Sequence, residues 1–201
     1  MEEFFENELI RKFEEMVENN DELYFETEEY EDIIIYYLEM GDISFAEMAT
    51  NYALKLHPNS LELKIKKFEV LLELENYTQA KELMQELQEA SMESTDFLVC
   101  CAKYYSNLGN PRRAITFFFI SLELEEEENF LHNFIADEYV NLEDPFNALK
   151  HYKLALKFDQ QDEYSLENVM FCYNQLSRSD EAIEFLNGYL NQFAFSETAW
   201  Y

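Results

Sequence analysis

The sequence has very few of the residues on which phosphate-binding and nucleic-acid-binding sites depend. Its 201 residues include only three glycines, which lie too far apart to form a phosphate-binding loop. Basic residues are also scarce, since 14 Lys and Arg stand against 43 Asp and Glu, for a net charge of −29. This deficit argues against nucleic acids and anionic membranes as partners, because both are bound by clustered Lys and Arg.

Cysteines and long apolar runs are equally sparse. The three cysteines, Cys100, Cys101 and Cys172, are an odd number and lie in helical patterns, which predicts free, buried thiols in a reducing compartment. The acidic N-terminus has no apolar signal core. The longest strongly apolar run, 114–122, is too short to span a bilayer. Together these features predict a cytoplasmic protein.

No group of residues forms a catalytic, cofactor-binding or metal-binding pattern. The three histidines, His57, His132 and His151, share no spacing that would predict a metal site. The adjacent pair Cys100-Cys101 lacks the spacer of metal-binding or redox cysteines. We therefore expect no cofactor and no enzymatic activity. A pair of titratable groups that converge in a deep pocket would instead favour an enzyme.

Alanine recurs at a fixed interval of 34 residues through most of the chain, at Ala46, Ala80, Ala114, Ala148 and Ala182. A period of this length is typical of stacked helical hairpins. A small residue on the second helix of such a hairpin lets neighbouring helices approach, whereas a larger one would overpack the contact. The period predicts one elongated domain whose units contact only their neighbours.

Each 34-residue unit reads as two amphipathic helices separated by a turn. Apolar residues recur at spacings of three and four. Breakers such as Met40-Gly41-Asp42 and Gly109-Asn110-Pro111 divide the units near their middle. With the recurrent alanine at position 20, the predicted units are 27–60, 61–94, 95–128, 129–162 and 163–196. An N-terminal capping helix and linker, 1–26, precede them, and 197–201 is the truncated start of a sixth unit.

This pattern resembles the tetratricopeptide repeat, whose consensus includes Tyr at position 11, Gly at 15, Ala at 20 and Pro at 32. The first unit matches at Tyr30, Ile33, Tyr37, Gly41, Ala46, Ala53, Leu54 and Pro58. The resemblance covers residues 27–196 without an insertion. It implies an all-α, right-handed α-solenoid of antiparallel helix pairs built from 34-residue repeats. In acidity and aromatic content the chain resembles acidic repeat proteins of the Bacteroidetes, whose functions are mostly unassigned.

Two parts of the chain depart from the repeat. Lys64 and Lys67 occupy positions 4 and 7 of their unit, which the family normally buries. We expect that helix to rotate, or the lysine stems to follow the apolar surface while their ammonium groups reach water. Trp200 falls at position 4 of a sixth unit. This predicts that the chain is a fragment that self-associates through its C-terminal end.

In the resembled family, peptides bind in a concave groove lined by the first helix of each unit, chiefly at positions 2, 5, 9 and 12. On this chain the candidate groove residues are Glu28, Glu31, Ile35, Leu38, Glu62, Ile65, Glu69, Leu72, Asp96, Val99, Lys103, Phe130, Asn133, Asp137, Tyr164, Glu167 and Phe171. They combine apolar side chains with seven carboxylates and one lysine. Such a surface favours a peptide that carries Lys or Arg. Alternatively, these residues are ordinary solvent-exposed positions on a helix face.

The resemblance implies a non-enzymatic protein-interaction scaffold that binds a peptide or protein segment in this groove. The acidity has two interpretations: it attracts a basic partner, or it serves only solubility through self-repulsion. An alternative function is a regulatory or sensor region of a larger protein whose effector domain lies outside this chain.

Overall fold

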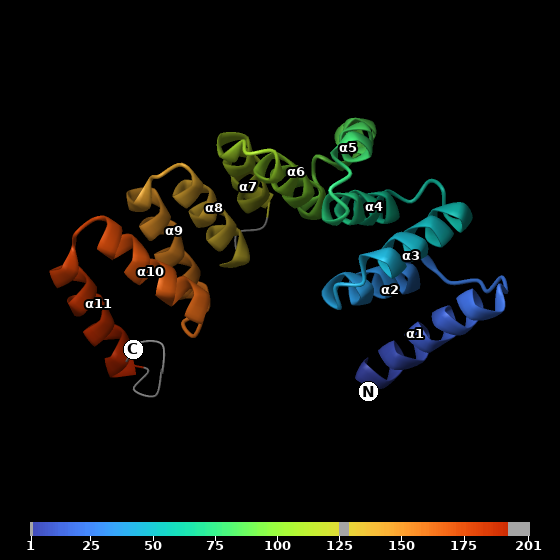
Figure 1. The fold of residues 1–201 in the computed structure, drawn as a ribbon, viewed down its shortest axis with the longest axis horizontal. Helices are drawn as coiled ribbons and strands as arrows, with labels where there is room; N and C mark the ends of the chain where they lie inside the picture. Colours follow the sequence, from blue (N-terminus) through green and yellow to red (C-terminus); the bar gives the residue numbers. More distant parts are fainter. Residues whose placement is uncertain (1, 125–128, 193–201) are drawn as a thin grey trace. The chain divides into compact units, whose positions relative to one another are not determined.

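The computed structural model describes residues 2–124 and 129–192, and these residues form eleven α-helices and no strand (Figure 1). The helices are α1 (Glu2–Asn19), α2 (Thr27–Glu39), α3 (Ile43–Leu56), α4 (Leu61–Glu73), α5 (Tyr77–Ser91), α6 (Thr95–Asn107), α7 (Pro111–Leu124), α8 (Asn129–Asn141), α9 (Pro145–Phe158), α10 (Glu163–Gln175) and α11 (Ser179–Gln192). The predicted all-α class is confirmed. The predicted segment 197–201 and its self-association lie outside the described residues.

The five predicted first helices begin at regular positions. Helices α2, α4, α6, α8 and α10 start at Thr27, Leu61, Thr95, Asn129 and Glu163. These starts are compatible with a repeat of 34 residues. The recurrent alanines lie on the second helix of each pair, and their exposed fractions are at most 8%. Their burial explains why a small side chain is required there.

Each pair of helices is joined by the same tight turn, in which position 15 adopts a positive φ. Gly41 and Gly109 have φ of 72° and 67°, and Glu75, Glu143 and Ser177 have φ of 54–57°. The next residue donates its backbone N–H to the carbonyl at position 11, as in the 2.9 Å bond from Asp42 to Tyr37. This is the Schellman arrangement, which satisfies the last carbonyls of a helix.

Polar side chains then start the next helix at once. The Asp42 carboxylate accepts the N–H of Phe45 at 3.2 Å, and Asp144 accepts that of Asn147 at 3.1 Å. Such caps satisfy N–H groups that have no partner within the helix. The turn therefore both ends one helix and begins the next, which holds the two helices antiparallel.

The helices gather into two compact units, Met1–Cys100 and Cys101–Tyr201. In the first unit, α1 packs on α2, and Phe13 is its fully buried centre. The Phe13 ring lies 6.2–6.5 Å from the rings of Phe25, Tyr30, Tyr37 and Tyr52. Aromatic pairs at this separation add to the free energy gained by burial. The apolar face of α1 thus covers the first helix pair.

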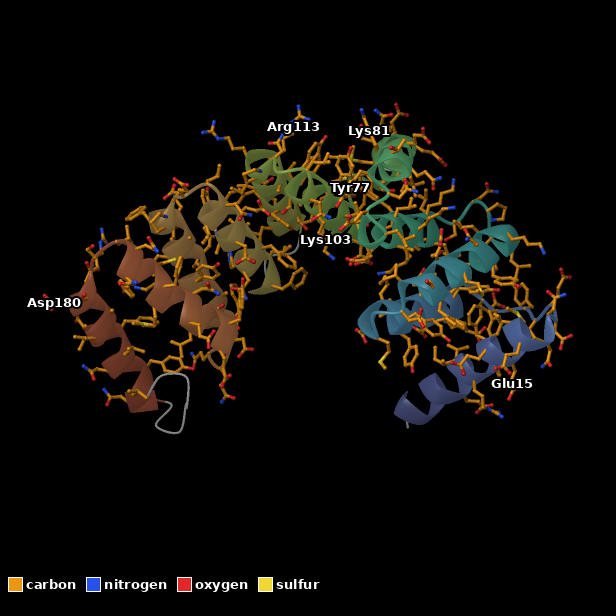
Figure 2. All side chains as sticks on the ribbon, in the orientation of Figure 1. Glu15, Tyr77, Lys81, Lys103, Arg113 and Asp180 are labelled. Carbon is orange, nitrogen blue, oxygen red and sulfur yellow. The ribbon has the colours of Figure 1, made fainter. Side chains whose placement is uncertain are left out.

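In the second unit, α9 is the central element and packs on both α8 and α10. Its inward residues include Ala148, Tyr152 and Leu156, which share a core with Val169 and Cys172 of α10. Helix α11 completes this core through Ala182. The two units therefore each have a core of their own, and exposed carboxylates such as Glu15 and Asp180 extend from their surfaces (Figure 2).

Candidate functional site

The predicted groove residues of α2 are accessible to different degrees. Glu28 is exposed, whereas Glu31, Ile35 and Leu38 are half-buried. Leu38 packs against the core of the first unit. This helix therefore offers carboxylates with an apolar margin, but of these four residues only Glu28 is fully exposed.

Helix α4 corrects the prediction at two positions. Ile65 and Leu72 are only 6% and 3% exposed, so both offer far less apolar surface than an open groove would require. The buried face of α4 is wide and also includes Leu63, Phe68 and Val70. At the edge of this face Lys64 reaches outward, and its Nζ lies 2.6 Å from Oε1 of Glu86.

The first unit has a pocket of about 280 Å³ at the start of α4 and α6. It brings together four of the predicted residues, Glu31, Glu62, Ile65 and Asp96. The remaining lining residues are Leu61, Lys66, Ala90, Ser91, Glu93 and Ser94. Four carboxylates and a single ammonium group thus line the pocket together with Leu61, Ile65 and Ala90.

The electrostatics of this pocket are unbalanced. Burial and the neighbouring Glu62 raise the pKa of the Glu31 carboxyl, and Lys66 only partly opposes this effect. The Nζ of Lys66 also lies 3.5 Å from Oε2 of Glu69, another predicted groove residue. Glu62 is better accommodated, because its own backbone N–H and the Ser60 hydroxyl lower its pKa. The charge of Glu31 is therefore only partly compensated.

Three more predicted residues lie on α6. Asp96 is exposed in the first turn of the helix, and Val99 is half-buried. Lys103 lies further along the helix, beyond the boundary between the two units, and is half-buried (Figure 2).

In the second unit, Asp137 is tied into a hydrogen-bond network. Its Oδ1 accepts the hydroxyl protons of Tyr152 at 2.5 Å and Tyr164 at 2.6 Å. Burial, followed by the bond to Asp137, raises the pKa of Tyr164 to about 12. The same causes raise the pKa of Tyr152 further. Asp137 thus fixes α8 against α9 and α10, so it has a structural role in addition to any contact with a partner.

Asn133 also joins two helices. Its Nδ2 donates to Asp162 at 2.8 Å, and its Oδ1 accepts the Ser165 hydroxyl proton at 2.6 Å. Asp162 is the N-cap of α10 and accepts the Ser165 N–H at 3.1 Å. Asn133 therefore positions the start of α10, a role that the repeat position alone could not reveal.

The other predicted residues of this unit are exposed. Phe130, Tyr164 and Phe171 have exposed fractions of 40%, 50% and 45%, and Glu167 is also exposed. Aromatic side chains at this exposure can supply contact area to a partner. Helices α8 and α10 thus present aromatic rings together with carboxylates.

A larger cavity of about 580 Å³ lies between α9, α10 and α11 and was not predicted. Its wall includes Lys153, whose Nζ lies 4.7 Å from the ring centre of Tyr173 and 4.9 Å from that of Phe185. Tyr189 lines the same wall and donates its hydroxyl proton to the carbonyl of Gln160 at 2.8 Å. The feature of the sequence that could have indicated this cavity is the set of apolar residues on α11, the second helix of the last unit.

The structure also brings two histidines together. Nδ1 of His132 lies 3.2 Å from Nδ1 of His151, so one ring donates to the other. Burial, with smaller contributions from His132 and Lys150, lowers the pKa of His151 to about 4. Their sequence separation of 19 residues gave no signal, because it is not a helical spacing. Burial also lowers the pKa of His132.

Over residues 2–124 and 129–192, no three His, Cys, Asp or Glu side chains are arranged to hold a metal ion. In the same part of the chain, no helix combines the length and apolarity needed to cross a bilayer. The cysteines are buried, and none forms a disulfide within the described residues.

No family model and no curated protein matches this sequence. Solved structures do match the fold. A thermophilic tetratricopeptide-repeat (TPR) protein of Thermus thermophilus, TTC0263, is 17% identical with a TM-score of 0.66, over 87% of this chain and 95% of that one. MamA is 16% identical with a TM-score of 0.66, over 89% and 100%.

A third structure, YrrB, is described as a TPR protein with an unusual peptide-binding site. It is 17% identical with a TM-score of 0.59, over 94% of this chain and 95% of that one. At such identities the likeness shows the fold alone. The chain therefore has the TPR fold of antiparallel helix pairs, as the sequence predicted.

Proposed function

We propose that this chain, which has the TPR fold, is a non-enzymatic protein-interaction scaffold that binds a basic peptide segment. The observation that carries the proposal is the acidic pocket of the first unit. Three predicted groove carboxylates, those of Glu31, Glu62 and Asp96, converge there from three different helices. The peptide-binding site named for YrrB supports the same use of the fold.

The chemistry of both units fits a segment that alternates basic and apolar side chains. The first unit supplies carboxylates beside half-buried Ile35 and Leu38. The second supplies exposed Phe130, Tyr164 and Phe171 beside Glu167. Carboxylates at the rim of an interface steer a cationic partner, and aromatic rings provide contact area. The buried cysteines support a reducing, cytoplasmic location.

Selection of a phage-displayed library of random 12-residue peptides tests the proposal. We expect the selected peptides to be enriched in Lys and Arg. Their binding, measured by fluorescence polarisation, should weaken as NaCl rises, because exposed charges are screened. Selection of acidic peptides, or binding without salt dependence, would contradict the proposal.

Charge-reversal variants then locate the surface. Glu28→Lys with Glu167→Lys changes two exposed carboxylates on α2 and α10. The matched control, Glu47→Lys with Glu82→Lys, makes the same charge change on the second helices α3 and α5. We expect at least a fivefold loss of affinity in the first pair and a smaller loss in the control. The reverse order would place binding on the second helices.

A further inference from the structure

We propose that the cavity between α9, α10 and α11 binds a small aromatic carboxylate. This inference goes beyond the proposed function, which concerns a peptide on the first helices of the pairs, because most of this cavity is lined by the second helices α9 and α11. Its volume of about 580 Å³ lies within the range of roughly 300–1,000 Å³ that is usual for small-molecule sites. The cavity therefore has room for a molecule of one or two rings.

Two lysines of α9 line this cavity. Lys153 and Lys157 are four residues apart, a spacing that puts two side chains on the same face of a helix. Basic residues are scarce in this chain, where 14 Lys and Arg stand against 43 Asp and Glu. Two of them at one cavity therefore favour an anionic ligand there.

The two lysines differ in how far the protein already satisfies them. Lys153 donates an N–H to the Tyr173 hydroxyl, and its Nζ lies 4.7 Å from the ring centre of Tyr173 and 4.9 Å from that of Phe185. These contacts hold the ammonium group in the cavity wall and are a sufficient structural reason for Lys153. Lys157 has no ion-pair or hydrogen-bond partner among the described residues. Its three N–H donors are therefore available to a ligand.

The two acids of the lining, Glu181 and Glu184, do not cancel this positive charge. Oε1 of Glu181 lies 3.5 Å from Nε of Arg178, so this carboxylate already has a partner. With Arg178 included, three cations stand against two carboxylates. The net charge of −29 repels an anion at long range, but salt of about 0.1 M screens charges more than roughly 10 Å apart. Recognition of a carboxylate therefore depends on direct contact with the ammonium groups.

The rest of the wall suits a flat apolar body. Phe185 and Tyr189 of α11 are half-buried, and Leu156 of α9 is only 8% exposed. Aromatic rings pack favourably on one another when they are offset or edge-on. Gly188 also lines the cavity, and a Cβ atom there would meet no heavy atom within 4 Å. Open space beside two aromatic rings, with lysines on another helix, is the arrangement that an aromatic carboxylate requires.

The test is an NMR titration of the ¹⁵N-labelled full chain with 1-naphthylacetate. We expect saturable shifts of the amides of residues 153–157 and 185–189, with a Kd of roughly 1 mM, as is typical of a ligand of this size. 1-Naphthylacetamide has nearly the same shape without the charge and should bind at least fivefold more weakly. Acetate, which has no ring, should give no saturable shift. Absence of saturation by about 10 mM naphthylacetate, or equal binding of the amide, would overturn the inference.

Substitutions of Gly188 tie the result to this cavity. Gly188→Leu should weaken naphthylacetate binding at least tenfold, because the larger side chain fills the open space, whereas Gly188→Ala should change it less than twofold. Both variants replace a glycine inside α11 by a better helix former, so neither should lower the urea unfolding midpoint. Equal binding of naphthylacetate by the two variants would refute the inference.

Substitution of Lys157 separates recognition of charge from a structural effect. Lys157→Gln should weaken naphthylacetate binding at least threefold and leave naphthylacetamide binding unchanged, because only the acid depends on the ammonium group. The matched control, Lys150→Gln, makes the same change at an exposed position of α9 outside the cavity and should alter neither. An equal loss of acid and amide binding in Lys157→Gln, or an equal loss of acid binding in the two variants, would contradict the inference.

Discussion

Two glycines offer a stability test in which the same chemical change has opposite effects, Gly41 at position 15 of its unit and Gly188 inside α11. Gly41 has φ of 72°, a conformation that costs an L-residue free energy, whereas Gly188 lies within α11. A Cβ atom at either glycine would meet no heavy atom within 4 Å. The two substitutions therefore differ in backbone conformation and not in packing.

The expected magnitudes follow from these conformations. Gly41→Ala should destabilise the first unit by about 1 kcal/mol, because alanine is strained at positive φ. Gly188→Ala should stabilise the second unit by roughly 0.5–1 kcal/mol, because glycine is unfavourable inside a helix. Glu143→Gly, at φ of 57°, should stabilise by about 0.5 kcal/mol, since relief of strain exceeds the added entropy of the unfolded chain.

Urea unfolding followed by circular dichroism at 222 nm measures these differences. Glu143→Gln is the control for Glu143→Gly, because it removes the same charge and keeps the strained side chain. We expect the glycine variant to be the more stable of the two. Equal midpoints for Gly41→Ala and Gly188→Ala, or a glycine variant at 143 less stable than the glutamine variant, would refute the argument.

Two further predictions concern packing and titration. Ala148→Leu should destabilise the second unit by about 1–3 kcal/mol in urea unfolding, because Ala148 is fully buried, while Ala90→Leu at an exposed position should change stability little. The folded-state pKa of His151, about 4, is below its ordinary value of 6.5, so the unfolded chain binds more protons between these values. Stability should be complete above pH 6.5 and fall as the pH drops towards 4, with about 2 kcal/mol lost between pH 7 and 5. His151→Asn should remove that part of the pH dependence, and a His151 ring that titrates near 6.5 by NMR would contradict it.

The helices and their order could be predicted because each repeat carries its own signals. The alanines, the apolar spacing and the breakers at Gly41 and Gly109 act locally, within one helix pair. The turns at Glu75 and Glu143 lack glycine, but the next residue in each, Asn76 and Asp144, is a polar N-cap of the kind that begins a helix.

The candidate surface was harder to predict, because accessibility depends on how each helix is rotated in its unit. A family position placed Ile65 and Leu72 on the surface, but the wide apolar face of α4 buries both. Asn133 and Asp137 were recognised as polar positions, but their hydrogen bonds to α10 and α9 depend on tertiary packing. The same is true of the His132–His151 contact, which joins two helices.

Mapping a selected basic peptide by NMR on the labelled chain tests the central claim most directly. If the first helices of the pairs form the binding surface, amide shifts should concentrate on α2 and α4 in the first unit and on α8 and α10 in the second. The shifts should diminish as NaCl is raised from about 50 to about 500 mM, by roughly the screening expected of exposed charges. Shifts confined to α3, α5, α9 and α11, or shifts that do not respond to salt, would contradict the claim.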